Sequence, residues 1–82
     1  MIARVWGCRG SLPTPGEATV RYGGNTSCVE IRCGSGIAMI LDAGTGIKRL
    51  GDELDPSAEI HVLLTHLHLD HLEGLRFFAP LW

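Results

Sequence analysis

Seven consecutive residues, THLHLDH at 65–71, contain three histidines and an aspartate. His66, His68 and Asp70 alternate with leucines, so in an extended segment these three side chains point to the same side. His71 follows where a helix is expected to begin, which would turn its ring toward the other three groups. Imidazole and carboxylate groups are ligands for zinc, and also for manganese or iron. The segment is therefore predicted to bind metal.

A purely structural role explains this segment less well. A single histidine near the end of a strand is usually a surface residue or a hydrogen-bonded one, and His61, inside EIHVLL, is interpreted as an ordinary strand residue. Four ionisable groups gathered in so small a protein would destabilise its thin core unless something compensated them. A bound cation would provide that compensation.

Four segments around the histidines have the composition of β-strands. In one of them, Val29 and Ile31 lie on one face, and the charged Glu30 and Arg32 lie on the other. Such alternation predicts a strand with one face in solvent. The turn GSG at 34–36 leads into a more apolar strand. The expected strands cover residues 2–7, 26–33, 37–44 and 59–64.

Two helices complete the predicted order β-β-β-α-β-α, which is an α/β domain. The first helix carries Ile47, Leu50 and Leu54 at helical spacing, with Thr45 as its expected cap. It joins two strands into a βαβ unit, so those strands should run parallel. The second helix is predicted over residues 70–78, before a proline.

The composition indicates one small globular domain of 82 residues, with 45% hydrophobic and 20% charged residues. Its three cysteines are an odd number without a C-x-x-C pair, which speaks against a disulfide framework and favours a reducing cytoplasm. We expect all three to be small buried residues. No apolar stretch is long enough to span a bilayer, and a net charge of −2 with scattered cations gives no basic face for nucleic acid.

The motifs resemble those of a known family. THLHLDH after an apolar strand resembles the H-x-H-x-D-H signature of the metallo-β-lactamase superfamily, and ILDAGTG resembles its strand-borne aspartate before a Gly-rich turn. WGCRGSLPTPG with YGGNTSCVEI resembles the opening of the phosphodiesterase and tRNase Z-like branch. The resemblance implies that residues 1–82 form one partial domain, the N-terminal β-β-β-α-β-α portion of an αββα sandwich.

The resemblance also assigns roles to single residues. It implies that His66 and His68 bind a first zinc ion, and that Asp70 and His71 bind a second. The implied activity is hydrolysis of a phosphoester or acyl bond, in which two metal ions lower the pKa of a bridging water. Asp70 would orient that water and take part in proton transfer.

Residues outside the histidine segment receive less specific roles. The resemblance makes Asp42 a carboxylate that orients the site from behind the ligands, although an aspartate in DAG also serves as a turn cap. Gly10, Ser11 and Asn25 would lie near the substrate, and ordinary turn chemistry is an equally good explanation for them.

The resemblance covers only part of the ligand set that such enzymes use. Members of the superfamily normally add a further histidine for each metal ion and an aspartate that bridges both ions. After His71 the sequence offers only Glu73 as an additional acid, and Glu73 is expected to favour the N-terminus of a helix.

Three explanations remain open for the missing ligands. The chain is a fragment or truncated product, it self-associates, or its site is degraded. The apolar segment LRFFAPLW favours association into a homo-oligomer. We expect a cytoplasmic, phosphodiesterase-like metal-dependent hydrolase represented by an N-terminal fragment; the alternative is a non-catalytic, self-associating metal-binding module of the same fold.

Overall fold

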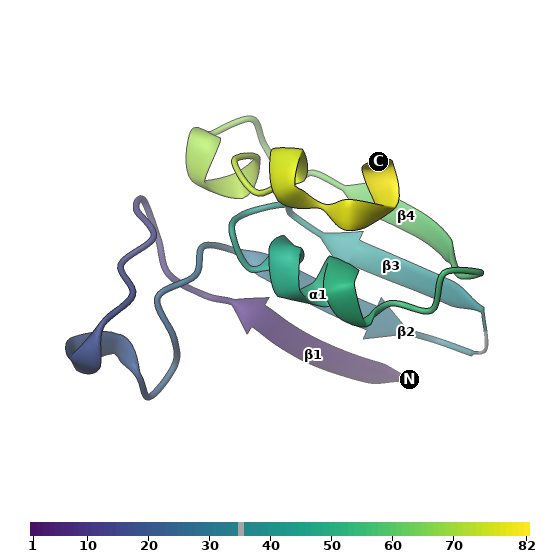
Figure 1. The fold of residues 1–82 in the computed structure, drawn as a ribbon, viewed down its shortest axis with the longest axis horizontal. Helices are drawn as coiled ribbons and strands as arrows, with labels where there is room; N and C mark the ends of the chain where they lie inside the picture. The colour runs from purple at the N-terminus through teal and green to yellow at the C-terminus, as the bar shows by residue number, and fades with distance from the viewer. Residues whose placement is uncertain (35) are drawn as a thin grey trace.

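A computed structural model describes residues 1–34 and 36–82 (Figure 1). Its centre is a four-stranded sheet in the spatial order β1-β2-β3-β4. The strands span Ile2–Gly7 (β1), Cys28–Arg32 (β2), Ile37–Leu41 (β3) and Glu59–Leu63 (β4). All four predicted strands are therefore present, with shorter bounds in three cases. The predicted GSG turn includes Ser35, which lies outside the described residues.

The sheet is mixed, with two antiparallel strand pairs and one parallel pair. Strand β2 pairs antiparallel with both β1 and β3, whereas β3 and β4 are parallel. Helix α1 (Ile47–Glu53) lies between β3 and β4 in the chain. It brings the chain back to the end of the sheet where β3 begins, so β4 can run parallel to β3, which confirms the predicted βαβ unit. None of the helices in the described part of the chain is long and apolar enough to cross a bilayer.

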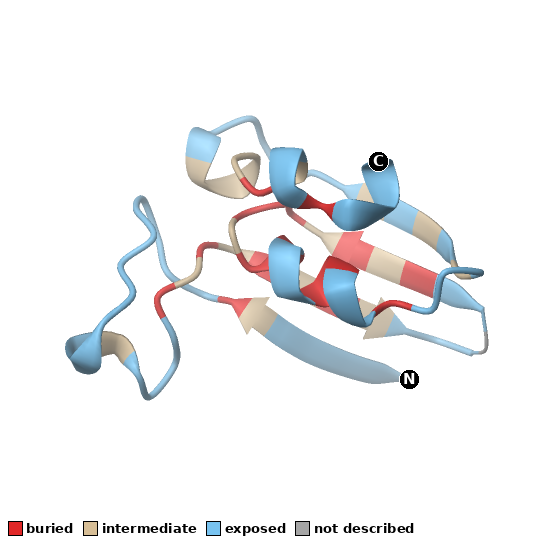
Figure 2. Ribbon diagram, in the orientation of Figure 1, coloured by how far each residue is buried: buried red, intermediate tan, exposed pale blue. Residues whose placement is uncertain are grey.

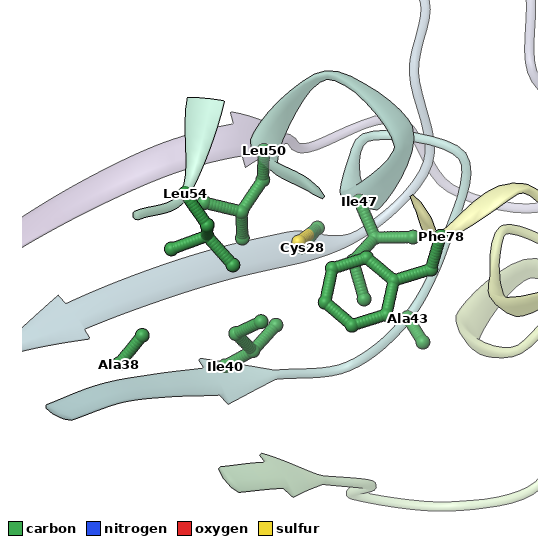
Figure 3. Close-up of a cluster of buried hydrophobic side chains, with 8 residues drawn as sticks. All are labelled: Cys28, Ala38, Ile40, Ala43, Ile47, Leu50, Leu54 and Phe78. Carbon is green, nitrogen blue, oxygen red and sulfur yellow. The ribbon is translucent and has the colours of Figure 1, made fainter. Parts of the chain in front are cut away.

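The hydrophobic core lies between the sheet and α1 (Figure 2). Ile47 and Leu50, which the helical spacing singled out, lie on the buried side of α1, and Leu54, directly after the helix, is buried as well. Phe78 comes from the C-terminal segment and packs beside Ile47, so that segment closes one end of the core (Figure 3). The core residues are Cys28, Ala38, Ile40, Ala43, Ile47, Leu50, Leu54 and Phe78. Burying each large apolar side chain stabilises the fold by roughly 1.5–3 kcal/mol.

The burial of β2 does not follow the polarity of its residues. Glu30 lies on the face covered by α1 and is only 2% exposed. Its charge is compensated there, because Trp6 Nε1 donates a hydrogen bond to it over 3.1 Å and the Arg32 guanidinium forms an ion pair with it. Val29 and Ile31 belong to the opposite face, over which the described residues place no helix (Figure 1). A charged residue is thus buried while an apolar face stays open.

The predicted second helix, at 70–78, is wrong. The segment forms three separate single 3₁₀ turns: η2 (Leu69–His71), η3 (Leu75–Phe77) and η4 (Ala79–Leu81). A continuous α-helix does not form because two of its backbone groups make hydrogen bonds with Ala43, in the turn after β3. Ala43 N–H donates to the carbonyl of His71, and Gly74 N–H donates to the carbonyl of Ala43. Another single turn, η1 (Glu17–Thr19), lies in the long loop between β1 and β2.

The expectation for the cysteines is only partly correct. All three thiols are free, but Cys8 and Cys33 are exposed, and only Cys28 is buried. Burial, with a smaller contribution from the nearby carboxylates of Glu30 and Asp42, raises the pKa of the Cys28 thiol to about 12.

This difference predicts the reactivity of the thiols. An aromatic disulfide reagent at mildly alkaline pH should label Cys8 and Cys33 quickly and Cys28 only at the rate of unfolding. Folding raises the pKa of Cys28 above its ordinary value of 9.0, so the unfolded state loses this proton first as the pH rises. Stability should therefore fall above pH 9, and less so in Cys28→Ala. Equal labelling rates at all three cysteines would contradict the burial of Cys28.

Close contact between two glycines gives a second prediction. A Cβ atom at Gly74 would lie 2.0 Å from the carbonyl oxygen of Gly44, whereas a Cβ at Gly10 would have nothing within 4 Å. Gly74→Ala should lower the free energy of unfolding by about 1–3 kcal/mol, because the segment after His71 must move away from β3. Gly10→Ala is the matched control and should change little. Urea titration measures both, and a stable Gly74→Ala protein would show that this contact is not needed.

Candidate metal centre

The ends of two neighbouring parallel strands position the candidate site. Asp42 follows β3 directly, and the segment 65–71 follows β4. Because β3 and β4 are parallel, these two segments leave the sheet at the same edge. Asp42 N–H donates to the carbonyl of Leu63 over 2.8 Å, which extends the pairing beyond the strands. Asp42 has a φ of 64°, a left-handed conformation that aspartate tolerates better than most residues.

Asp42 is the buried carboxylate behind the histidines and is 4% exposed. Oδ1 accepts a hydrogen bond from Thr65 N–H over 2.8 Å, and Oδ2 accepts one from the Thr65 hydroxyl over 2.8 Å. Oδ2 also accepts from His71 Nδ1 over 2.8 Å. Burial raises the pKa of Asp42, but the bonds from the Thr65 backbone, His71 and the Thr65 hydroxyl outweigh it and hold the pKa below its usual value.

His66 and His68 form the first pair of candidate ligands. Both are exposed, and His66 Nε2 lies 3.1 Å from His68 Nδ1. Two ligand atoms on a tetrahedral zinc ion with bonds of about 2.0–2.1 Å are about 3.3 Å apart, so the two nitrogens have nearly the spacing that zinc needs.

Asp70 and His71 form the second pair. Asp70 Oδ2 lies 3.4 Å from His71 Nε2, which again matches the ligand spacing of about 3.3 Å on zinc. His71 Nδ1 donates to the Asp42 carboxylate, so in a neutral ring Nε2, the nitrogen nearest Asp70, carries the lone pair. The Ser11 N–H donates to Asp70 Oδ2 over 3.0 Å and is the main reason why the pKa of Asp70 is lowered.

The two pairs adjoin, because the ring centroids of His66 and His71 are 4.2 Å apart. Among residues 1–34 and 36–82, however, no three histidine, cysteine or acidic side chains converge on one ion position. Each zinc ion would thus take two ligands from the described residues, whereas zinc usually binds three or four protein ligands. The donor atoms are of the kind that zinc binds, and each pair has a suitable spacing. Their number is about half of what two zinc ions usually bind.

Ser11 and Asn25 have different surroundings. Ser11 contacts the site through its backbone N–H, which donates to Asp70 Oδ2, and its φ of 67° is left-handed. Asn25 Oδ1 accepts a hydrogen bond from the Thr45 hydroxyl over 3.2 Å, so its described contact is with the turn before α1. The structure therefore brings Ser11, but not Asn25, to the candidate ligands.

A pair of threonines that the sequence did not single out connects the turn after β3 to β2. Thr26 N–H donates to Thr45 Oγ1 over 2.9 Å, and Thr45 N–H donates to Thr26 Oγ1 over 2.8 Å. The prediction that Thr45 caps α1 is therefore wrong: the helix begins after Gly46, without a side-chain cap. Thr26 also donates to Glu73 Oε1 over 3.4 Å, which gives Glu73 a specific partner. Only the fold reveals these contacts, because their partners are far apart in sequence.

His61 is separate from the cluster, as expected. It lies within β4, is exposed, and contacts Glu59 Oε1 over 2.6 Å. Neighbouring residues on β4 alternate between the faces of the sheet, which places His61 with the open face.

Comparison with known proteins identifies the superfamily of the chain. The family model of the metallo-beta-lactamase superfamily matches residues 21–82, which is most of the chain and includes both ILDAGTG and THLHLDH. No curated protein and no solved structure gives a match. The observed fold, a small α/β domain with a mixed four-stranded sheet, is consistent with part of that superfamily's architecture. The chain belongs to the metallo-beta-lactamase superfamily.

Proposed function

We propose that this chain contributes one part of the active site of a metal-dependent hydrolase, of the phosphodiesterase-like branch, with zinc as the metal. The observation that carries the proposal is the spacing of four donor atoms at one edge of the sheet. His66 Nε2 and His68 Nδ1 are 3.1 Å apart, and Asp70 Oδ2 and His71 Nε2 are 3.4 Å apart. A buried carboxylate behind them holds His71 in the ligating orientation.

The chemistry divides between the metal and the protein. Bound zinc ions would supply a water of lowered pKa and positive charge for the phosphoryl oxygens. His66, His68 and His71 present lone pairs or exchangeable N–H groups toward this position. Asp70 is held by the Ser11 N–H, which donates to Oδ2, and this carboxylate would orient the attacking water and accept its proton.

The charge of the chain supports a metal-dependent route to an anionic substrate. Its net charge is −2, and its cationic side chains are scattered in sequence. A phosphodiester would therefore find its main positive charge at the metal ions rather than on a basic surface. The resemblance of the Gly-rich opening, WGCRGSLPTPG, supports the phosphodiesterase-like branch.

Metal binding tests the proposal directly. Titration of the metal-free protein with zinc, followed by calorimetry, should show saturable binding and a rise in the melting temperature that a chelator reverses. His66→Ala and His71→Ala should each weaken zinc binding at least tenfold, because each removes one of only two ligands in its pair. His61→Ala is the matched control, since it removes an exposed histidine outside the cluster, and it should bind zinc normally.

An activated phosphodiester, bis(4-nitrophenyl) phosphate, tests the reaction in the same samples. Zinc-dependent release of nitrophenolate that is lost in His71→Ala and kept in His61→Ala supports a hydrolase. We expect slow turnover, because the described residues supply only two ligands for each ion. Zinc binding without turnover supports the non-catalytic alternative, and a protein that takes up no zinc would eliminate both.

A second candidate function is favoured by the open face of the sheet. Val5, Ile37 and Leu63 remain 62%, 48% and 48% exposed. The strand register places four apolar residues in one row across this face: Val5, Val29, Leu41 and Leu63. An apolar face of this kind favours association. We propose self-association of the chain as a metal-binding module on this basis.

Light scattering coupled to size exclusion measures the association. The wild-type protein should have at least twice the monomer mass, and Ile37→Glu should shift it toward the monomer, because a charge on an apolar interface is costly to bury. Leu12→Glu is the matched control: Leu12 is 69% exposed in the loop after β1, and its replacement should leave the mass unchanged. A monomeric wild-type protein at high concentration would exclude this module.

A further inference from the structure

We propose that Asp42 fixes the proton position on one histidine of each ligand pair, on His71 directly and on His66 through the hydroxyl of Thr65. Thr65 is then a positioning residue that makes the Nε2 atom of His66 available as a ligand. The inference rests on the proposed function in so far as these histidines bind zinc. It adds Thr65, to which the sequence assigned no role.

The contacts of the Thr65 hydroxyl determine the direction of each hydrogen bond. Thr65 Oγ1 lies 2.8 Å from Asp42 Oδ2, 3.0 Å from Asp42 Oδ1 and 2.9 Å from His66 Nδ1. A hydroxyl has one proton to donate, and a carboxylate can only accept. The Thr65 proton therefore goes to Asp42, and Oγ1 has only lone pairs left for His66. His66 Nδ1 must carry a proton and donate it to Thr65.

This direction leaves the other ring nitrogen of His66 without a proton. A neutral imidazole carries one N–H, so a proton on Nδ1 makes Nε2 a lone-pair donor. His66 Nε2 is the atom that faces His68 Nδ1 at 3.1 Å. The same logic holds for His71, whose Nδ1 donates to Asp42 and whose Nε2 faces Asp70. One carboxylate thus prepares a nitrogen in each pair.

His68 differs from the other two histidines. In the metal-free protein its Nδ1 faces the lone pair of His66 Nε2 and must donate to it. His68 therefore has its proton on the very nitrogen that would bind the metal, and this proton must leave Nδ1 when zinc binds. His66 and His71 therefore have the ligating nitrogen free of a proton before zinc binds, whereas His68 does not.

The geometry of Thr65 is fixed at two points. Its backbone N–H donates to Asp42 Oδ1 over 2.8 Å, so both the backbone and the side chain bind the same buried carboxylate. Its β-branched side chain has few rotamers, which keeps Oγ1 between Asp42 and His66. Thr65 is itself exposed, and its backbone N–H still donates to Asp42 when the hydroxyl is removed.

Nitrogen NMR of ¹⁵N-histidine-labelled protein, free of metal and at a pH where the rings are neutral, reports which ring nitrogen carries the proton. In the wild-type protein His66, His68 and His71 should all be protonated on Nδ1. Thr65→Val removes the hydroxyl at nearly constant shape and should shift the His66 proton toward Nε2 while His71 stays unchanged as an internal control. Thr65→Ser should restore the wild-type pattern, and Asp42→Asn should alter both His66 and His71.

Zinc titration of the same variants gives a second readout. Thr65→Val should bind zinc about 10–100-fold more weakly, the usual effect of losing a group that orients a histidine ligand, and Thr65→Ser should bind nearly normally. A wild-type His66 protonated on Nε2, or a His66 unaffected by Thr65→Val, overturns the inference even if zinc binds. The expected proton positions without any zinc binding would instead support the hydrogen-bond relay and reject the proposed function.

Discussion

The carboxylate of Asp42 is the group on which the site depends. It is buried at the end of β3, and a buried charge is tolerated only when hydrogen bonds replace its water. The two residues that supply those bonds, Thr65 and His71, begin and end the segment 65–71. Satisfying one charge therefore shapes the whole ligand segment. The fold needs these bonds for stability, and the same bonds aim the ring nitrogens outward.

The sequence predicted the parts of this arrangement that have a local cause. The positions of the strands, the spacing of Ile47, Leu50 and Leu54, and the parallel βαβ unit all follow from short-range patterns, and all are present. The candidate ligands could be named because THLHLDH is compact. Its internal geometry could be anticipated only in outline, since the proton positions depend on Asp42, which is 29 residues away from His71 in the chain.

The wrong predictions share a physical origin, which is competition from distant partners. The helix at 70–78 does not form because Gly74 and His71 bond to Ala43 rather than continuing a helix. Thr45 does not cap α1 because Thr26 offers it two hydrogen bonds. Glu30 is buried with a hydrogen bond from Trp6, 24 residues away, in addition to its ion pair with the neighbouring Arg32. In each case a polar group forms a hydrogen bond with a residue far away in the sequence. The periodicity of apolar residues along the chain does not predict such bonds.

The bond between Ser11 and Asp70 affects how the protein reaches its working state. It joins residues 59 positions apart, and Ser11 lies in the long Gly-rich loop between β1 and β2. Contacts of such long range form late in folding, because the chain must first lose the entropy of a large loop. Asp70 therefore receives its final orientation only after the strands are paired. A cation that needs Asp70 would select fully folded molecules, and metal uptake would report the last step of folding.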